Sequence, residues 1–254
     1  TIFLIKNMLY KNLKLSRRLL IQTVTISFFR FSSFFDRIWA FTHMGFSHLY
    51  FWKMKGLLFY KLFGSGTGEG FTPVLNPNVY AIMNVWENEE IAENSLASSI
   101  IFRKYKQRSK ENWTLYLRPT KCWGSWDKNN PFQINKNQKQ TYPVVALTRA
   151  TIKTRILFKF WKHVPDISDR IGSNNNVLFK IGLGEIPWFH QVTFSIWPDQ
   201  ESMDQFARKD GPHSKAIEAV RKNKWFKEEL YARFTIEKEV GSWPDNKMQS
   251  LEKK

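Results

Sequence analysis

The 254-residue sequence has little cysteine and no long apolar run. Its single cysteine, Cys122, excludes an intrachain disulfide and a cysteine-based metal cluster, and it fits a reducing compartment. The apolar run at residues 2–5 is too short for the core of a signal peptide or for a membrane-spanning helix, and no longer uncharged run follows. We therefore predict a cytoplasmic protein that does not cross a membrane.

The motifs of common nucleotide-binding and hydrolytic enzymes are also missing. Residues 64–70 read Gly-Ser-Gly-Thr-Gly-Glu-Gly, but no Gly-Lys-Ser/Thr follows, and Pro73 argues against a phosphate-binding helix start. This segment is predicted to be a flexible lid or a tight loop. The sequence has no Gly-x-Ser-x-Gly for a serine nucleophile and no histidine–carboxylate spacing that suggests a non-haem iron site.

Acidic residues are in deficit. The chain has 39 Lys and Arg against 22 Asp and Glu, a net charge of +17, which favours nucleic-acid phosphates or anionic lipid headgroups as partners. Residues 1–20 mix basic residues with leucines, a composition typical of segments that lie on membrane surfaces. We therefore predict possible peripheral association with the cytoplasmic membrane, with a disordered leader as the alternative.

The chain contains one pattern twice. Val79–Trp86 is followed by an acidic, helix-like run and a short strand, and Gln191–Trp197 is followed by the same succession. Each copy closes on Gly-Ser-Trp, at residues 124–126 and 241–243, and the second copy is about six residues longer, around Asp210-Gly211-Pro212-His213. The repeat indicates a pseudo-symmetric fold with one elaborated half.

Hydrophobic periodicity and turn residues predict the order βαββαβ in each copy. The expected strands are Ile21–Phe31, Gly56–Phe63, Val79–Trp86 and Trp113–Leu117, then Val144–Thr148, Val177–Ile181, His190–Trp197 and Leu230–Ile236. The expected helices are a stretch capped by Ser32 or Ser33, with Phe34, Phe35, Ile38, Trp39 and Met44 on its apolar positions, then Glu87–Ser109, Thr151–Val164 and Gln200–Phe226, broken at Gly211-Pro212.

We therefore predict an α+β fold in which two ferredoxin-like βαββαβ modules form an α+β barrel. The expected organisation is a basic amphipathic leader at 1–20, a first module at 21–120, a polar linker at 121–142, a second module at 143–240 and a tail at 241–254. Aromatic residues make up 16% of the chain, which suits either thick packing or a large apolar cavity.

His190 opens an expected strand and alternates with Val192, Phe194 and Ile196. We expect this apolar face to pack on the helices and the Gln191 face to line the barrel interior. By this pattern His190 is a packed side chain more often than a ligand.

His213 follows the break at Gly211-Pro212, and Ala216, Ile217 and Val220 follow it at helical spacing. This spacing predicts that His213 lies on the inward stripe of its helix. On spacing alone a packed core histidine is the commoner interpretation, but the first copy has no histidine at the matching place.

Several stretches together resemble the spheroidene monooxygenase family of carotenoid oxygenases, over about residues 24–236. They are Phe28-Phe29-Arg30-Phe31, residues 64–73, Ala146–Ile152, Val164–Ser168, Phe179–Pro187, His190–Asp199, Asp210-Gly211-Pro212-His213 and Glu228–Phe234. The resemblance implies an oxygen-dependent monooxygenase that contains haem b, takes electrons from an external donor protein such as a ferredoxin, and oxidises an acyclic carotenoid.

The resemblance also implies roles for individual residues. His213 is the implied axial ligand of the haem iron, with His190 as the alternative. Arg149, Lys180 and Arg30 are implied partners of the haem propionates or of bound oxygen, and Gln191 and Trp197 are implied distal residues. A homodimer is also possible.

Two rival functions belong to other classes. Ferredoxin-like modules with a basic surface also bind RNA, but neither copy has the Lys/Arg-Gly-aromatic-Gly/Ala-aromatic strand, so we expect no specific nucleic-acid binding. The second rival is a haem protein with different chemistry on the same barrel, such as dehydration or dismutation.

Overall fold

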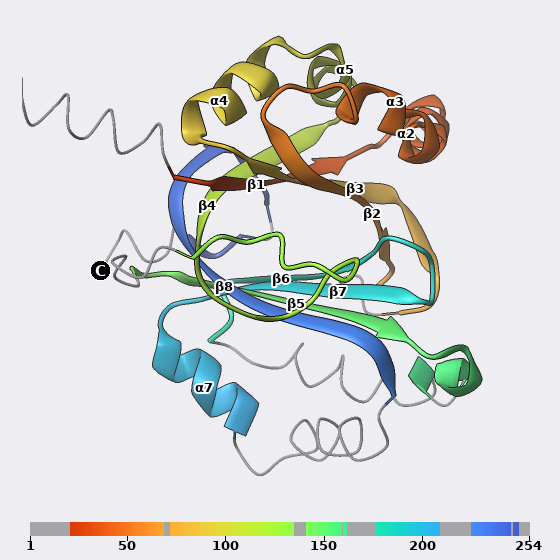
Figure 1. Cartoon of the computed structure of the whole chain (residues 1–254). Helices are drawn as coiled ribbons and strands as arrows, with labels where there is room; N and C mark the ends of the chain where they lie inside the picture. Colours follow the sequence, from red (N-terminus) through yellow and green to blue (C-terminus); the bar gives the residue numbers. More distant parts are fainter. Residues whose placement is uncertain are drawn as a thin grey trace, which may run out of the picture.

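The computed structural model describes residues 21–68, 72–134, 141–158, 160–161, 176–208, 225–244 and 246–248. Eight strands dominate the described part of the chain, and helices cover their outer faces (Figure 1). The strands are β1 (Thr23–Arg30), β2 (Leu57–Gly66), β3 (Leu75–Trp86), β4 (Glu111–Gly124), β5 (Val144–Ile152), β6 (Phe179–Gly184), β7 (His190–Trp197) and β8 (Phe226–Gly241).

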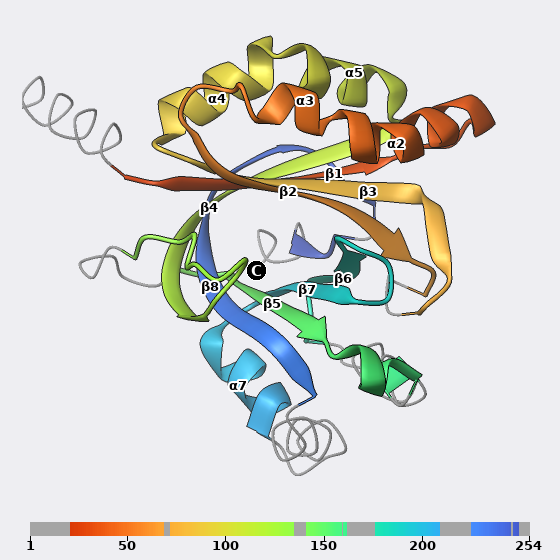
Figure 2. The same ribbon diagram turned by 45° about the vertical axis from the view of Figure 1, so that its right-hand side comes forward.

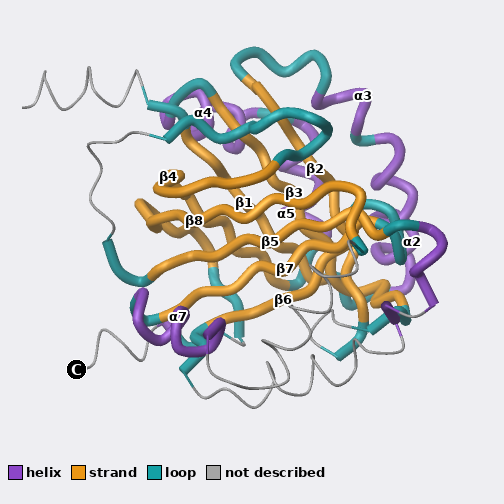
Figure 3. The backbone as a smooth tube through the Cα atoms, turned by 60° about the horizontal axis from the view of Figure 1, so that its bottom comes forward, coloured by secondary structure: helices purple, strands orange, loops and turns teal. Residues whose placement is uncertain are grey.

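The eight strands form one closed antiparallel barrel in the order β1-β3-β2-β6-β7-β5-β8-β4. Each half has the same internal order, β2-β3-β1-β4 in the first and β6-β7-β5-β8 in the second (Figure 3). The halves join through a long β4–β8 pairing and through a short β2–β6 pairing at Gly64↔Gly184 and Ser65↔Leu183. This topology confirms the predicted barrel of two ferredoxin-like modules.

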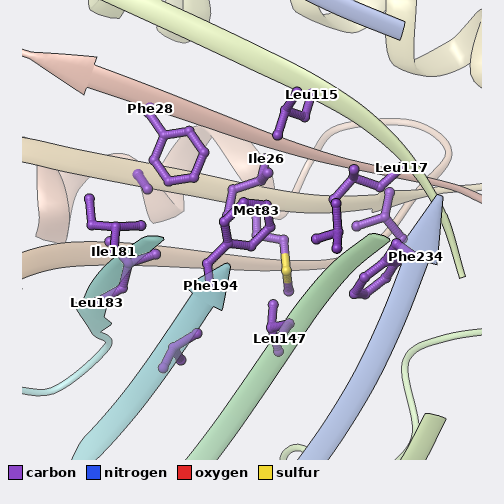
Figure 4. Packing of buried hydrophobic residues seen from close by; sticks show 14 of the residues in the cluster. Ile26, Phe28, Met83, Leu115, Leu117, Leu147, Ile181, Leu183, Phe194 and Phe234 are labelled. Carbon is purple, nitrogen blue, oxygen red and sulfur yellow. The ribbon is translucent and has the colours of Figure 1, made fainter. Parts of the chain in front are cut away.

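Apolar side chains fill the barrel interior. Alternate residues of each strand point inward, and Phe28 meets Phe179 and Phe194 with ring centroids 5.4 and 5.5 Å apart. Figure 4 labels ten members of this core, Ile26, Phe28, Met83, Leu115, Leu117, Leu147, Ile181, Leu183, Phe194 and Phe234. Much of the aromatic surplus therefore serves packing.

Helices α2 (Phe34–Phe46), α3 (His48–Phe51), α4 (Glu89–Ser98) and α5 (Ile100–Arg108) cover the outer face of the N-terminal half (Figure 2). A second apolar core lies between them and the sheet. The predicted helix Glu87–Ser109 is two helices, because Ser99 ends α4 and its hydroxyl caps α5 at Phe102 N–H. None of the helices in the described ranges is long and apolar enough to span a bilayer.

The predicted orientation of β7 was wrong. Val192, Phe194 and Ile196 belong to the barrel core, whereas Trp197 packs on the outer face with Met203 and Phe206 of α7 (Gln200–Arg208). The Gln191 face therefore points outward. The inner face of a closed small barrel is itself a dry core, so alternation alone could not tell which apolar face meets helices.

Several element ends also differ from the prediction. β2 extends to Gly66, so the glycine-rich segment begins inside a strand, and β8 begins at Phe226, which was expected to end a helix. β4 extends to Gly124, four residues into the predicted linker, and Trp126 and Phe132 of that linker are buried in the barrel core. Because the predicted linker is polar in composition, the sequence did not indicate that Trp126 and Phe132 are buried.

The repeated Gly-Ser-Trp has one structural role in both halves. Gly124 and Gly241 have φ values of 93° and 85°, and a Cβ at either would lie 2.2 Å from a backbone carbonyl oxygen. Each glycine lets the chain turn inward after its strand, and the tryptophan that follows enters the barrel core. Trp126, from the first half, lies against Arg149 of the second, and Trp243, from the second, lies against Arg30 of the first.

These turns give a stability prediction. Gly124→Ala and Gly241→Ala should each lower the free energy of unfolding by at least roughly 1–3 kcal/mol, because alanine is strained at positive φ and its methyl group meets a backbone carbonyl. Gly64→Ala is the matched control, since a Cβ there has no atom within 4 Å. Urea denaturation of the three variants tests this, and equal stability would contradict it.

Candidate functional site

A cluster of charged side chains lies inside one end of the barrel. Arg149 is 1% exposed, and its guanidinium pairs with Glu228 and, at 3.3 Å, with Glu185. Lys61 of β2 lies 2.7 Å from Glu185 and 2.6 Å from Asp127. The cluster therefore joins β2, β5, the chain after β6, the chain after β4, and β8 by ion pairs.

Trp126 covers this cluster. Its indole N–H donates to Glu185 at 2.9 Å, and the Arg149 guanidinium lies 5.6 Å from its ring centroid. Burial alone would raise the pKa of Glu228, but hydrogen bonds from the Lys128 backbone N–H, Arg149 and Ser125 outweigh it and lower that pKa. The carboxylate is therefore ionised at neutral pH.

His190 points toward the same charged cluster. Its Nδ1 lies 3.9 Å from Glu185, beyond hydrogen-bond reach, and within the described ranges this buried atom has no hydrogen-bond partner. Burial lowers the pKa of His190, and nearby Arg149 and Lys61 act in the same direction against Glu185. The imidazole is therefore neutral at pH 7 and faces the barrel end, away from the outer sheet surface.

Arg30 lies at the opposite end of the barrel from Arg149, because β1 and β5 run in opposite directions around it. Its guanidinium pairs with Glu111 at 2.9 Å and lies 4.7 Å from the ring centroid of Trp243. The structure therefore does not bring Arg30 and Arg149 together, and each has a carboxylate partner.

The outer face of the C-terminal half presents small side chains in register. Strand pairing places them in three rows across β6, β7, β5 and β8. The rows are Lys180-Ser195-Ala146-Arg233, Gly182-Thr193-Thr148-Tyr231 and Gly184-Gln191-Ala150-Glu229. On this face the two central strands, β7 and β5, and much of β6 therefore carry few bulky side chains.

The N-terminal half is different at its corresponding face. There Phe29, Leu62, Tyr80, Ile82 and Tyr116 project outward and pack in the helix-covered core. Two sheets of one topology therefore have different outer surfaces, one packed with aromatic and aliphatic groups and one lined mostly by small side chains. We call the second one the small-residue face.

Polar side chains border the small-residue face. Tyr231 Oη donates to Glu229 at 2.9 Å, and Arg233 pairs with Asp204 of α7 at 3.2 Å. Gln191 lies at the β7 margin and Lys180 at the β6 margin, both partly buried. Lys180 and Gln191 therefore share this outer face, whereas the Gln191 face was predicted to line the barrel interior.

The remaining predicted residues divide between other places. Trp197 is 3% exposed, packs on α7, and donates to Ser195 at 2.9 Å. His213 lies outside the described residues, so its predicted role as ligand stays a prediction. The sequence analysis did not identify Lys61, Asp127, Glu185 and Glu228 as a group. A signal was present, because Arg149 lies two residues after the inward-facing Leu147 and so on the same face of the strand, where a charge needs buried partners.

The fold places the chain among α+β barrel proteins. It superposes on a crystal structure of aldoxime dehydratase with a TM-score of 0.59 over 91% of this chain and 88% of that one, at 11% identity, which establishes likeness of fold alone. No protein-family model matches the chain.

Sequence comparison defines the family within this fold. The chain is 48% identical to the spheroidene monooxygenase of Cereibacter sphaeroides over 87% of its own length and 69% of that protein. It is 45% identical to that of Rhodobacter capsulatus, over 86% and 92%, and 30% identical to that of Rubrivivax gelatinosus, over 74% and 72%. The chain belongs to the spheroidene monooxygenase family.

The charged cluster gives a second prediction. Arg149→Met should lower the free energy of unfolding by roughly 3 kcal/mol, because it breaks the ion pairs of the buried guanidinium with Glu185 and Glu228, although Lys61 stays paired with Glu185. Lys238→Met, which removes an exposed pair with Glu93, should cost less than about 1 kcal/mol. Thermal and urea denaturation distinguish the two, and a small loss for Arg149→Met would show that the cluster is not structural.

Proposed function

We propose that the protein is a haem-dependent monooxygenase that introduces oxygen, as a keto or hydroxy group, into an acyclic carotenoid such as spheroidene. The observation that carries the proposal is membership of the spheroidene monooxygenase family at 48% identity over most of the chain. Its proposed co-reactants are molecular oxygen and electrons from a donor protein such as a ferredoxin. Bound haem supplies the site at which oxygen is activated.

The small-residue face is the proposed haem site. A macrocycle needs a surface without bulky side chains, and the small residues in the rows around Thr148 and Thr193 support this choice. Residues 209–224, which carry His213, connect the end of α7 to the start of β8, and both elements belong to this half. This connectivity supports His213, rather than His190, as the proposed axial ligand, since His190 points toward the charged cluster.

The polar border of the same face supplies the other proposed contacts. The Lys180 ammonium and the Arg233 guanidinium are cations suited to propionates, and both lie in one row. Gln191, in the third row, can donate a hydrogen bond from its amide at the margin where oxygen and substrate would meet. Arg149 and Arg30 face the two barrel ends and not this outer face, so they are proposed to act through the stability of those ends.

A nucleic-acid function has less support. RNA-recognition modules stack bases on the sheet face opposite their helices, and in this barrel that face is the interior, which apolar side chains fill. The charge of the chain alone does not distinguish nucleic acid from lipid headgroups.

The haem ligand is tested by spectroscopy. Protein expressed with haem supplied should show a Soret band that shifts with dithionite and carbon monoxide, and His213→Ala should lose or shift the band. His190→Ala is the control and should keep it, because that imidazole points into the barrel end. Absence of haem from the wild-type protein would overturn the proposal, and loss of the band only in His190→Ala would reassign the ligand.

The small-residue face is tested by filling it. Thr148→Trp should weaken haem binding at least about tenfold, a loss of ~1.4 kcal/mol, because an indole would occupy the centre of the middle row. Thr148→Val keeps the size of the side chain and should bind haem normally. Titration of the apoproteins with haemin measures this, and equal affinity of both variants would place the haem elsewhere.

A further inference from the structure

Large apolar side chains stand exposed on the outer side of α2 and α3. Ala40 and Phe51 bury the inner side of these helices against the sheet, but the opposite side carries aromatic and aliphatic groups as well. We call this the α2–α3 surface, defined by six residues with their exposed fractions: Phe34 (68%), Phe35 (78%), Ile38 (47%), Phe41 (65%), Leu49 (67%) and Trp52 (71%).

On α2 the spacing of these residues makes one continuous apolar stripe. Phe34, Ile38 and Phe41 lie at i, i+4 and i+7 on α2, so they form one stripe along the helix. Phe34 and Phe35 pack on each other with ring centroids 5.8 Å apart while remaining exposed. Isolated exposed apolar residues are ordinary, but a contiguous apolar patch marks a binding surface.

Other apolar tips lie on the same side of the molecule. The β2–β3 hairpin, the β6–β7 turn and the segment that begins at η1 (Thr154–Ile156) all lie with α2 at the right of Figures 1 and 2. They expose Val74, Ile186 and Phe158 by 62, 51 and 92%. Hydrogen bonds from Trp188 to the Pro73 carbonyl, at 2.9 Å, and from Trp161 to the Trp188 carbonyl, at 3.2 Å, hold these tips together.

Basic side chains accompany the apolar ones. Arg108 pairs with Asp36 of α2 at 2.9 Å, which places it beside the α2–α3 surface. The backbone N–H of Lys110 donates to the carbonyl oxygen of Arg30, at the end of β1. Arg155 belongs to η1. All three cationic side chains are exposed. This side of the molecule therefore combines aromatic rings with positive charge.

We propose that this side of the protein docks on an anionic lipid bilayer, with the rings of the α2–α3 surface at headgroup depth and the basic side chains on lipid phosphates. The charge favours a bilayer over a second copy of the chain, since protein interfaces are depleted of lysine and a like-charged partner would be repelled. The docking does not involve residues 1–20.

The docking proposal rests on the proposed function only for the reason why the protein would bind a membrane. The β6–β7 turn joins Gly184 to Gln191, which are neighbours in the third row of the small-residue face. Docking through this side would therefore bring the margin of the proposed haem site to the membrane, where a long apolar polyene is dissolved. Vesicle binding needs no haem and no carotenoid, so the two proposals can fail separately.

The test is partition of the full chain onto vesicles of phosphatidylcholine, with and without phosphatidylglycerol. The wild-type protein should bind, and more strongly with phosphatidylglycerol. Phe34→Ser/Phe35→Ser/Phe41→Ser should weaken binding at least about tenfold, because three exposed rings lose their apolar contact. Lys110→Gln/Arg155→Gln should reduce the gain from phosphatidylglycerol.

The matched control is Ile100→Ser/Trp123→Ser/Val240→Ser, which removes three exposed apolar side chains from other elements and should bind like the wild type. Unchanged binding of the triple phenylalanine variant would overturn the proposal and assign any binding to residues 1–20. Equal losses in both triple variants would overturn it as well. If the phenylalanine variant instead turns a dimer into a monomer in light scattering and keeps its vesicle binding, the surface joins two copies of the chain.

Discussion

The barrel depends on two tryptophans that each close the end belonging to the other half. Trp126 leaves the first half after a glycine turn and covers Arg149 of the second, and Trp243 does the reverse over Arg30. Each arginine is an inward-facing cation near the end of the first strand of its half, and each pairs with a carboxylate. Arg149 is 1% exposed, and burying such a charge costs several kcal/mol unless it is paired, so its carboxylates are needed there; Arg30 keeps 33% of its side chain exposed.

The outer faces of the two halves differ, although both barrel ends are closed in the same way. In the N-terminal half, aromatic side chains fill the outer face and four helices pack on them. In the C-terminal half, the same strand order carries alanine, threonine and glycine. One outer face can therefore change in sequence while the interior and the closed ends supply the stability.

The sequence predicted the fold better than the site. The internal repeat and its βαββαβ order led to the barrel because both copies carry the same periodic signals, and β7 was predicted with its bounds intact. The closing motif Gly-Ser-Trp was visible, but a sequence cannot show that each tryptophan crosses into the other half. The prediction assigned the inner and outer faces of β7 the wrong way round, because a closed barrel has two apolar environments, the interior and the helical layer.

The site residues show the same limit. Arg149 alternates with apolar inward-facing residues, which indicates burial but names no partners, since Lys61 and Glu185 come from distant parts of the chain. The predicted apolar positions of α2 included Phe34, Phe35 and Ile38, which are exposed. A helix that is apolar on both sides gives no sequence signal of which side meets the protein. The family resemblance implied roles for His213 and Gln191 that periodicity does not give, and those roles stay predictions.

The crossed tryptophan plugs bear on how such a chain can vary. A single module that ends in Gly-Ser-Trp has no barrel end of its own to fill, so it closes only on a second copy that returns the same plug. Two identical copies must use one sequence for both outer faces, because any change in one appears in the other. Joining the copies in one polypeptide removes that symmetry, so one half can keep large side chains under its helices while the other carries small ones.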